Sequence, residues 1–197
     1  MMEQRLIAKG ALQYDPTFLS KQEADTLLEC LRQSVTWEQK FYRYGGKQVP
    51  QPRLTAWYAD QANMEYSYSG ITQTVLPWLP ELLELKKKIE IVSGAEYNSV
   101  LLNFYRDGSD SVGFHSDDEK ELGENPSIAS ISLGAIRTFE LREKYAIVSD
   151  GGIDYELAHG SLLIMSGSTQ KYWQHSIPKA YGLKESRINL TFRKFSQ

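Results

Sequence analysis

Two segments in the first half of the chain show the apolar spacing that is typical of amphipathic helices. The first starts with the capping-box pattern Ser20–Glu23, and its apolar residues predict a helix over about residues 21–33. The second begins near Pro77 or Pro80 and carries three lysines at 86–88, where positive charge suits the C-terminal end of a helix. We therefore expect two helices before residue 95.

From about residue 97 the pattern changes to short alternating or β-branched runs that are separated by glycine-containing turns. These runs lie at 98–105, 128–133, 136–142, 145–148, 153–158, 161–165, 171–176 and 187–193. About eight strands in this half predict a jelly roll or a barrel with the two helices packed on its outside. The fold class that we expect is mainly β with flanking α helices.

The composition is that of an ordinary globular domain. The chain has 197 residues, 41% of them hydrophobic and 24% charged, so one domain is expected and a disordered chain is excluded. No apolar run is long enough to span a membrane and Met1–Arg5 is not apolar, so we expect a cytoplasmic protein without membrane association. We expect it to be a monomer. The net charge of −3 is unlike that of proteins that coat nucleic acid, but it leaves room for a local basic groove.

The most informative polar residues lie in the segment 187–193. If this segment is a strand, its apolar residues face a core and its polar residues share the opposite face. Two guanidiniums inside a barrel are costly unless an anion pairs with them, and a small dicarboxylate would satisfy both. The alternative is a polar face in contact with water. The residues of this face are Arg187, Asn189, Thr191 and Arg193.

A second group of residues has the spacing of a metal site. Cys30 is the only cysteine, so a metal would have to be held by His, Asp or Glu. His115 and Asp117 lie on one side of an extended backbone, and His175 follows 60 residues later. This order, with Arg187 shortly after the second histidine, matches the facial triad of non-haem iron oxygenases. The same alternation puts Asn103 and Tyr105 on one face of their strand.

Several ordered motifs make this match more specific. The chain from about residue 50 to 195 resembles the AlkB family of Fe(II)/2-oxoglutarate dioxygenases, in the branch of the second and third human homologues. The motifs that carry the resemblance are Pro52–Tyr58, Tyr66–Gly70, Asn103–Gly108, His115–Glu119, Ile128–Gly134, His159–Met165, Trp173–Ser176 and Arg187–Arg193.

The resemblance implies a double-stranded β-helix (jelly-roll) core over residues 96–195, preceded by a helical and nucleotide-recognition extension over residues 1–95. It also implies repair of alkylated DNA or RNA by oxidative demethylation of bases such as 1-methyladenine and 3-methylcytosine. Dioxygen and 2-oxoglutarate would be consumed, and formaldehyde, succinate and carbon dioxide would be released.

The resemblance also assigns roles to individual residues. His115, Asp117 and His175 would hold Fe(II) and form the catalytic centre. Arg187 would pair with the distal carboxylate of 2-oxoglutarate, and Arg193 would lie near its iron-bound end. The remaining residues of the 2-oxoglutarate pocket would be Asn103, Tyr105, Asn189 and Thr191.

A damaged base must leave the stack before an oxidant can reach it, so aromatic surfaces and a polar reader are expected. The candidates for contact with the substrate are Arg53, Trp57, Tyr66, Tyr68 and Glu119. Core packing is the other interpretation of these aromatic residues. Residues 40–53 are basic and aromatic, which suits a backbone groove, and Gly45-Gly46 indicates a hairpin that serves as a lid or is simply exposed.

Three alternatives remain open from the sequence. The chain could be a facial-triad oxygenase that acts on a protein, a lipid or a small molecule, since one fold hosts many substrates. It could instead be a binding module that has kept a metal without turnover. His159, beside a glycine, could be a third ligand or a structural residue.

Overall fold

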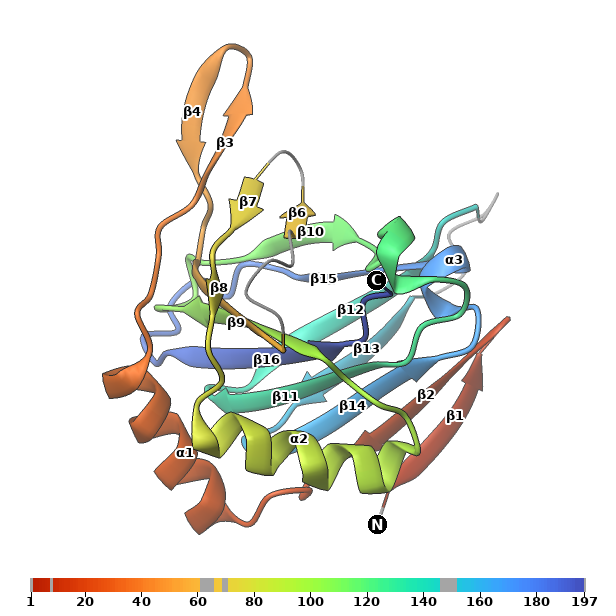
Figure 1. Ribbon diagram of the computed structural model, residues 1–197. Coiled ribbons are helices and arrows are strands. Elements are labelled where there is room, and N and C mark those ends of the chain that lie inside the picture. The colour runs from red at the N-terminus through yellow and green to blue at the C-terminus, as the bar shows by residue number, and fades with distance from the viewer. Residues whose placement is uncertain (1, 8, 61–65, 69–70, 146–151, 197) are drawn as a thin grey trace.

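Two sheets face each other, and two helices cover the outer face of the larger sheet (Figure 1). The computed structural model describes residues 2–7, 9–60, 66–68, 71–145 and 152–196, with only the backbone of residues 44, 66–68 and 71–73. The larger sheet has the order β1 (Glu3–Ile7), β2 (Gly10–Asp15), β14 (Ser161–Ser166), β11 (Ile128–Gly134), β16 (Arg187–Arg193), β9 (Ser99–Tyr105), β5 (Leu54–Ala59) and β8 (Val75–Leu76).

The smaller sheet and the remaining elements complete the architecture. The smaller sheet has the order β10 (Val112–His115), β15 (Trp173–Ile177), β12 (Arg137–Glu143) and β13 (Ile153–Leu157). The helical elements are α1 (Lys21–Ser34), α2 (Pro80–Ser93), α3 (Thr169–Tyr172) and the 3-10 helix Lys120–Leu122. The hairpins are β3 (Phe41–Tyr44) with β4 (Lys47–Pro50) and β6 (Tyr66–Tyr68) with β7 (Ile71–Gln73).

The alternation of side chains along the central strands separates two cores. On β16, Ile188, Leu190 and Phe192 pack with residues of α1 and α2 in the core beneath the larger sheet. A second core lies between the sheets and contains Phe139 from β12 and Trp173 from β15. β16 lies between β11 and β9 in the larger sheet, its apolar face is covered by the two helices, and its polar side chains point toward the space between the sheets.

The hairpin β3–β4 projects from the body of the molecule (Figure 1). Its two-residue turn is Gly45-Gly46, and both residues have positive φ angles, of 55° and 77°. A two-residue turn with positive φ at both positions matches the twist of the flanking strands, and glycine adopts it without a steric cost. The hairpin that the sequence predicted is therefore confirmed. Whether it acts as a lid stays a prediction.

Most predicted elements agree with the structure. The two helices and the mainly β architecture are confirmed. The run 171–176 was wrong in its first two residues, because α3 ends at Tyr172 and β15 begins at Trp173. The run 145–148 lies mostly outside the described residues. The N-terminal extension also supplies β1, β2, β5 and β8 to the larger sheet, so the expected division near residue 95 does not separate two layers of the fold.

Among the described residues, no helix combines the length and the apolar character that crossing a membrane requires.

The capping box at the start of α1 gives a test of the helix assignment. The Ser20 Oγ accepts from the Glu23 amide at 3.3 Å, and the Glu23 carboxylate accepts from the Ser20 amide at 2.9 Å. Ser20→Ala should lower the free energy of unfolding by about 1 kcal/mol, measured by urea denaturation. The matched control is Ser34→Ala at the other end of α1, which should change stability by less than about 0.5 kcal/mol. Equal effects of the two substitutions would contradict the capping role.

Candidate active site

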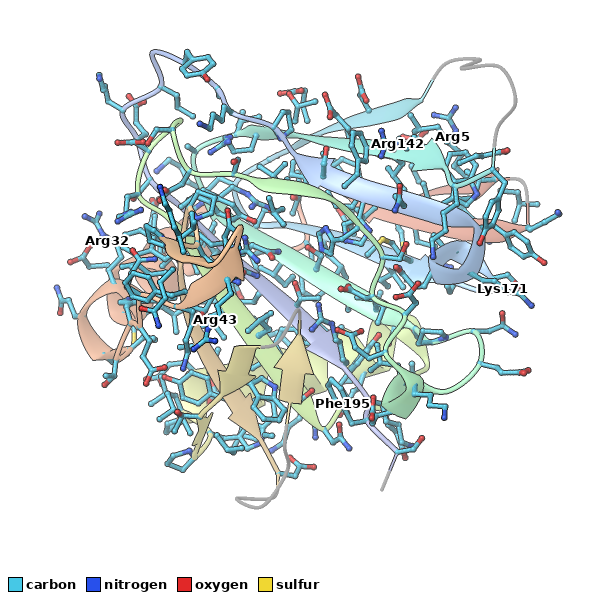
Figure 2. The ribbon with its side chains drawn as sticks, turned by 90° about the horizontal axis from the view of Figure 1, so that it is seen from above. Arg5, Arg32, Arg43, Arg142, Lys171 and Phe195 are labelled. Atoms are coloured by element: carbon cyan, nitrogen blue, oxygen red, sulfur yellow. The ribbon has the colours of Figure 1, made fainter. Side chains whose placement is uncertain are left out.

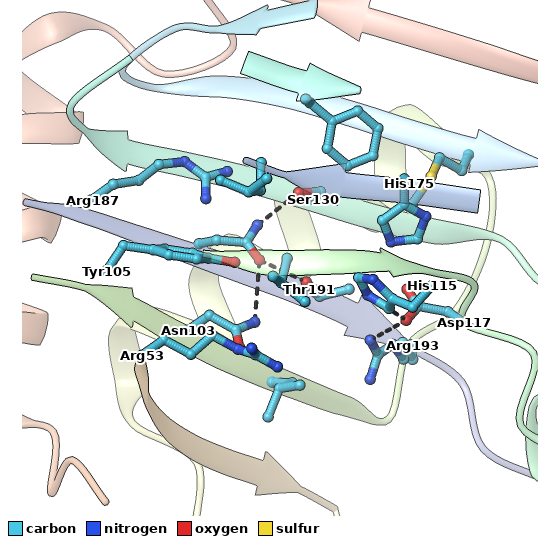
Figure 3. Close-up of a pocket in the computed structure, with 16 residues that line it drawn as sticks. Arg53, Asn103, Tyr105, His115, Asp117, Ser130, His175, Arg187, Thr191 and Arg193 are labelled. Atoms are coloured by element: carbon cyan, nitrogen blue, oxygen red, sulfur yellow. Dashed lines mark hydrogen bonds and ion pairs between the residues drawn. The ribbon is translucent and has the colours of Figure 1, made fainter. Parts of the chain in front are cut away.

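A narrow polar cavity of about 50 Å³ lies between the two sheets. Its walls come from β9, β10, β11, β12, β14, β15 and β16, and the close-up in Figure 3 shows most of its polar side chains pointing inward. The cavity is narrow, so a ligand held in it contacts side chains from both sheets. Such a site binds by specific contacts rather than by loose enclosure.

Three potential metal ligands meet at one end of the cavity. His115 and His175 face each other as paired residues of β10 and β15, with ring centroids 4.3 Å apart. Asp117 follows β10, and one ligand atom of each of the three residues lies within 4.8 Å of the others. Two imidazoles and one carboxylate on one side of a cation leave its other side open. The sequence prediction that these three residues come together is confirmed.

The protonation of the cluster suits metal binding. The His115 Nδ1 lies 2.9 Å from the Gly113 carbonyl, which can only accept, so Nδ1 carries a proton that donates to it, and Nε2 lies 4.0 Å from the Asp117 carboxylate. Burial lowers the pKa of His175 to about 3, so this imidazole is neutral at neutral pH. Neutral imidazoles with one N–H held by a carbonyl are the usual form of histidine ligands.

Asp117 is held from two sides. Its side chain is 2% exposed, and Arg193 donates from Nη2 to its Oδ1 at 2.6 Å. Its backbone N–H donates to the Oε1 of Gln170 at 2.9 Å. Burial opposes ionisation, but the charge of Arg193 leads the contributions that outweigh it, and the pKa of Asp117 lies below its ordinary value. The carboxylate is therefore ionised and fixed in place.

The far end of the cavity offers a cation without an anion. Arg187 is 1% exposed and donates from Nη2 to the Ser132 Oγ at 2.9 Å. Its Nε and Nη1 atoms are buried and have no hydrogen-bond partner in the described part of the chain. Buried unpartnered donors are costly, and a carboxylate is the acceptor that matches a guanidinium fork. The site therefore suits a carboxylate at this end.

A chain of hydrogen bonds lines the wall between the two ends. Arg53 donates from Nε to the Asn103 Oδ1 at 2.8 Å, and the Asn103 Nδ2 donates to the Asn189 Oδ1 at 3.4 Å. Asn189 donates in turn to the Ser130 Oγ at 2.7 Å, and Thr191 donates to the Asn189 Oδ1 at 3.0 Å. Because each amide is held at both ends, these side chains are fixed in position around the cavity.

The predicted cosubstrate residues therefore share one cavity. The walls of the cavity contain all six of them, namely Asn103, Tyr105, Arg187, Asn189, Thr191 and Arg193. Their roles toward a ligand stay predictions.

The residues predicted to contact a substrate do not form one surface. Trp57 is 1% exposed and packs edge-on against Phe195, which favours core packing over contact with a substrate. Glu119 is partly buried just before the 3-10 helix. The side chains of Tyr66 and Tyr68 lie outside the described residues.

The basic residues of the segment 40–53 also do not form one surface. Arg43 and Lys47 are exposed on the hairpin, whereas Lys40 forms an ion pair with Glu38. Arg53 is 8% exposed and lines the cavity, so it does not belong to an exposed basic groove with the hairpin residues.

His159 has a structural role. Its Nδ1 accepts from the Gly134 N–H at 2.8 Å, so its proton is on Nε2, which donates to Asp25 at 3.0 Å. Both ring nitrogens are thus engaged in joining α1 to the end of β11.

The sequence alone did not identify Gln170, Ser132 or Arg137 as part of the site or its support. Gln170 lies on the four-residue helix α3, and Ser132 appears in its sequence as an ordinary strand residue. Their function depends on pairing between strands that are distant in the chain. Alternation along β11 would have been the one available signal, because it places Ser130 and Ser132 on the same face.

Comparison with known proteins agrees with this geometry. The model of the 2OG-Fe(II) oxygenase superfamily matches residues 11–193. The chain is 49% identical over 185 residues to the rat (Rattus norvegicus) alpha-ketoglutarate-dependent dioxygenase alkB homolog 3, which covers 90% of the chain and 62% of that protein. It is 40% identical over 198 residues to the mouse (Mus musculus) DNA oxidative demethylase ALKBH2, which covers 96% of the chain and 82% of that protein.

The chain thus spans less than two thirds of the length of the rat homolog 3. Solved structures share the fold at low identity. The structure of OsALKBH1 has a TM-score of 0.63 at 18% identity and covers 98% of this chain and 100% of its own. A prolyl hydroxylase from Trichoplax adhaerens, in complex with a hypoxia inducible factor peptide fragment, has a TM-score of 0.61 at 12% identity. The match covers 93% of this chain and 83% of the hydroxylase chain. From the family model, the identities and the triad, the chain belongs to the 2OG-Fe(II) oxygenase superfamily and, within it, to the AlkB family.

Proposed function

We propose that this protein is a 2-oxoglutarate-dependent dioxygenase that removes alkyl groups from the bases of DNA or RNA by oxidation. The observation that carries the proposal is a single cavity with three metal ligands at one end and the buried guanidinium of Arg187 at the other. A five-carbon dicarboxylate is suited to such a cavity, because it can present one carboxylate to each end. The mouse relative is a DNA oxidative demethylase, which supports nucleic acid as the substrate.

The residues present fit Fe(II) and 2-oxoglutarate. His115, Asp117 and His175 would hold the iron, and at neutral pH the buried His175 imidazole is neutral and the Asp117 carboxylate is ionised, as metal ligands must be. With dioxygen, the bound pair supplies an oxidant for a carbon attached to nitrogen, and the hydroxylated carbon leaves as formaldehyde. Arg187 would bind the distal carboxylate of the cosubstrate, and its unpartnered Nε and Nη1 would donate to it.

The remaining cavity residues orient the ligands and exclude water. Arg193 fixes the Asp117 carboxylate and adds positive charge beside the carboxylate that would lie at the metal end. Asn103 and Asn189 hold each other's amides, so their orientation is set before a ligand enters. Preorganised polar groups of this kind cost no rearrangement on binding. Tyr105, 2% exposed, closes the cavity near Arg187.

The hairpin β3–β4 would bind the nucleic acid backbone. Arg43 and Lys47 are exposed on the two strands of the hairpin, together with Phe41, which is 50% exposed. Figure 2 shows Arg43 on the opposite side of the molecule from Arg5 and Lys171. Cations with exposed aromatic rings suit single strands, whose bases are free to stack. With a net charge of −3, we propose single-stranded DNA or RNA as the favoured form and a monomer as the acting species.

The test of the proposed function is mass spectrometry of a 1-methyladenine oligonucleotide with the protein, Fe(II) and ascorbate. The mass should fall by one CH₂ group per lesion, and only when both dioxygen and 2-oxoglutarate are present. The single-stranded form should react faster than the duplex. Succinate formation without any change in the oligonucleotide would contradict the nucleic acid substrate and favour another substrate of the same fold.

A substitution at Asp117 tests the metal end. Asp117→Asn keeps an oxygen that can accept from Arg193 but removes the charge of the carboxylate, so Mn(II) affinity should fall by about tenfold or more. Isothermal titration with Mn(II) measures it. The control is Asp118→Asn, because Asp118 is 59% exposed, pairs with Lys144 and is not one of the three potential ligands. Unchanged Mn(II) affinity in the Asp117 variant would remove this residue from the metal site.

A double substitution tests the hairpin. Arg43→Ala with Lys47→Ala should weaken binding of a single-stranded oligonucleotide and reduce the salt slope of binding by about 1.4, at about 0.7 per cation. Fluorescence anisotropy at several salt concentrations measures both, and 2-oxoglutarate affinity should not change. The matched control is Arg5→Ala with Lys171→Ala, two exposed cations on the other side of the molecule. Equal slopes for the two double variants would exclude the hairpin as the binding surface.

A further inference from the structure

Arg137 on β12 is a buried cation outside the cavity walls. Arg137 is 2% exposed, and its guanidinium donates to three backbone carbonyls. The acceptors are Asp107 at 3.3 Å, Asp110 at 2.9 Å and Pro178. No carboxylate forms an ion pair with it within the described ranges of the chain. Burial lowers the pKa of Arg137, and the nearby charges of Asp110 and Asp107 offset this only in part, so the buried cation is costly and needs a compensating interaction.

Tyr105 connects this cation to the cavity. The Arg137 guanidinium lies 5.6 Å from the centroid of the Tyr105 ring, and the Arg187 guanidinium lies 5.3 Å from the same centroid. Tyr105 and Arg187 line the cavity, and Arg137 does not. Two buried guanidiniums therefore share one aromatic ring, and neither is paired with a carboxylate in the described part of the chain. Burial, together with the charge of Arg137, lowers the pKa of Arg187 to about 10.

The two positive charges repel each other, and an anion bound near both would offset this repulsion. A carboxylate that contacts Arg187 would be attracted by both guanidiniums, because the interior screens charges far less than water does. A ligand that lacks this carboxylate gains nothing from Arg137. We propose that Arg137 is a positioning residue that acts through Tyr105, without touching the ligand, to give the cavity its preference for a dicarboxylate over a monocarboxylate. The inference rests on the proposed function, in which 2-oxoglutarate is the cosubstrate.

Arg137 also joins two loops beside Tyr105. Its acceptors belong to the loop after β9 and to the loop after β15, and these loops bond directly as well, with Gly108 N–H to Leu183 O at 3.0 Å. If fastening the loops were its whole role, its loss would loosen the site for every ligand. The charge adds a different effect, which depends on the distal carboxylate of the ligand. The ratio of two affinities therefore separates the two roles.

The experiment compares 2-oxoglutarate with 2-oxopentanoate, which has the same number of carbons and lacks only the distal carboxylate. Dissociation constants are measured by isothermal titration with Mn(II) in place of iron, so turnover does not contribute. In Arg137→Met the preference for 2-oxoglutarate should fall by about tenfold, while 2-oxopentanoate affinity stays within about threefold. Arg137→Lys, which keeps the charge, should retain the preference within about threefold.

The matched control is Arg142→Met. Arg142 lies on the same strand and its guanidinium stacks on an aromatic ring, that of Phe114 at 3.7 Å, but it is exposed. Its loss should leave both affinities unchanged. If Arg137→Met does not fold, as judged by circular dichroism, Arg137→Gln carries the same test, because it keeps a donor for the carbonyls without the charge.

Two results would overturn the inference. One is an unchanged preference in the neutral variant, and the other is equal weakening of both ligands. If neither neutral variant folds, a preference lost in Arg137→Lys overturns it, and a retained preference supports it. A wild-type protein that does not prefer 2-oxoglutarate would contradict the proposed function itself, before any variant is compared.

Discussion

The alternation of side chains along β16 is the constraint on which the rest of the molecule depends. This strand lies in the middle of the larger sheet with both faces covered, and all seven of its residues are buried. Its apolar residues hold the sheet to the two helices, and its polar residues line the cavity. A shift of one residue in its pairing would put two guanidiniums into the apolar core, so the fold and the site specify each other.

The cavity also depends on an unequal distribution of charge. One end gathers the anionic and neutral ligands of the metal cluster, and Arg193 neutralises the carboxylate there. At the other end the cations Arg187 and Arg137 lie beside Tyr105. Arg187 donates to a hydroxyl, and Arg137 donates to backbone carbonyls. The ligand-free protein therefore holds electrostatic strain at one end and a preformed cluster at the other. A dianion would offset the repulsion between the two guanidiniums, and a cation would bind the cluster of ligands.

Much of this arrangement could be predicted from the sequence, since it follows from local periodicity. The segment 187–193 has period two, which identified both the strand and the residues that share the cavity. The histidines and Asp117 were found from their order in the chain. For Trp57 the sequence left core packing and substrate contact open, because an aromatic residue at strand spacing looks alike in a core and on a binding surface, and its burial against Phe195 favours the core.

Other features could not be predicted because they depend on contacts between distant segments. β1 is largely exposed and shows no alternation, so its place at the edge of the sheet follows from its pairing with β2. Arg137 looks like a surface cation in its sequence, next to the exposed Ile136, yet its acceptors lie 27 to 41 residues away. Gln170 reaches Asp117 across 53 residues from a helix of four residues.

Metal and 2-oxoglutarate are proposed to bind together in the cavity between the sheets. This can be measured as the affinity for 2-oxoglutarate with and without Mn(II), and the affinity for Mn(II) with and without 2-oxoglutarate. Shared occupancy predicts that each ligand raises the affinity for the other by the same factor, about tenfold or more. Affinities that do not depend on the second ligand would mean that the two bind apart, and would contradict this account.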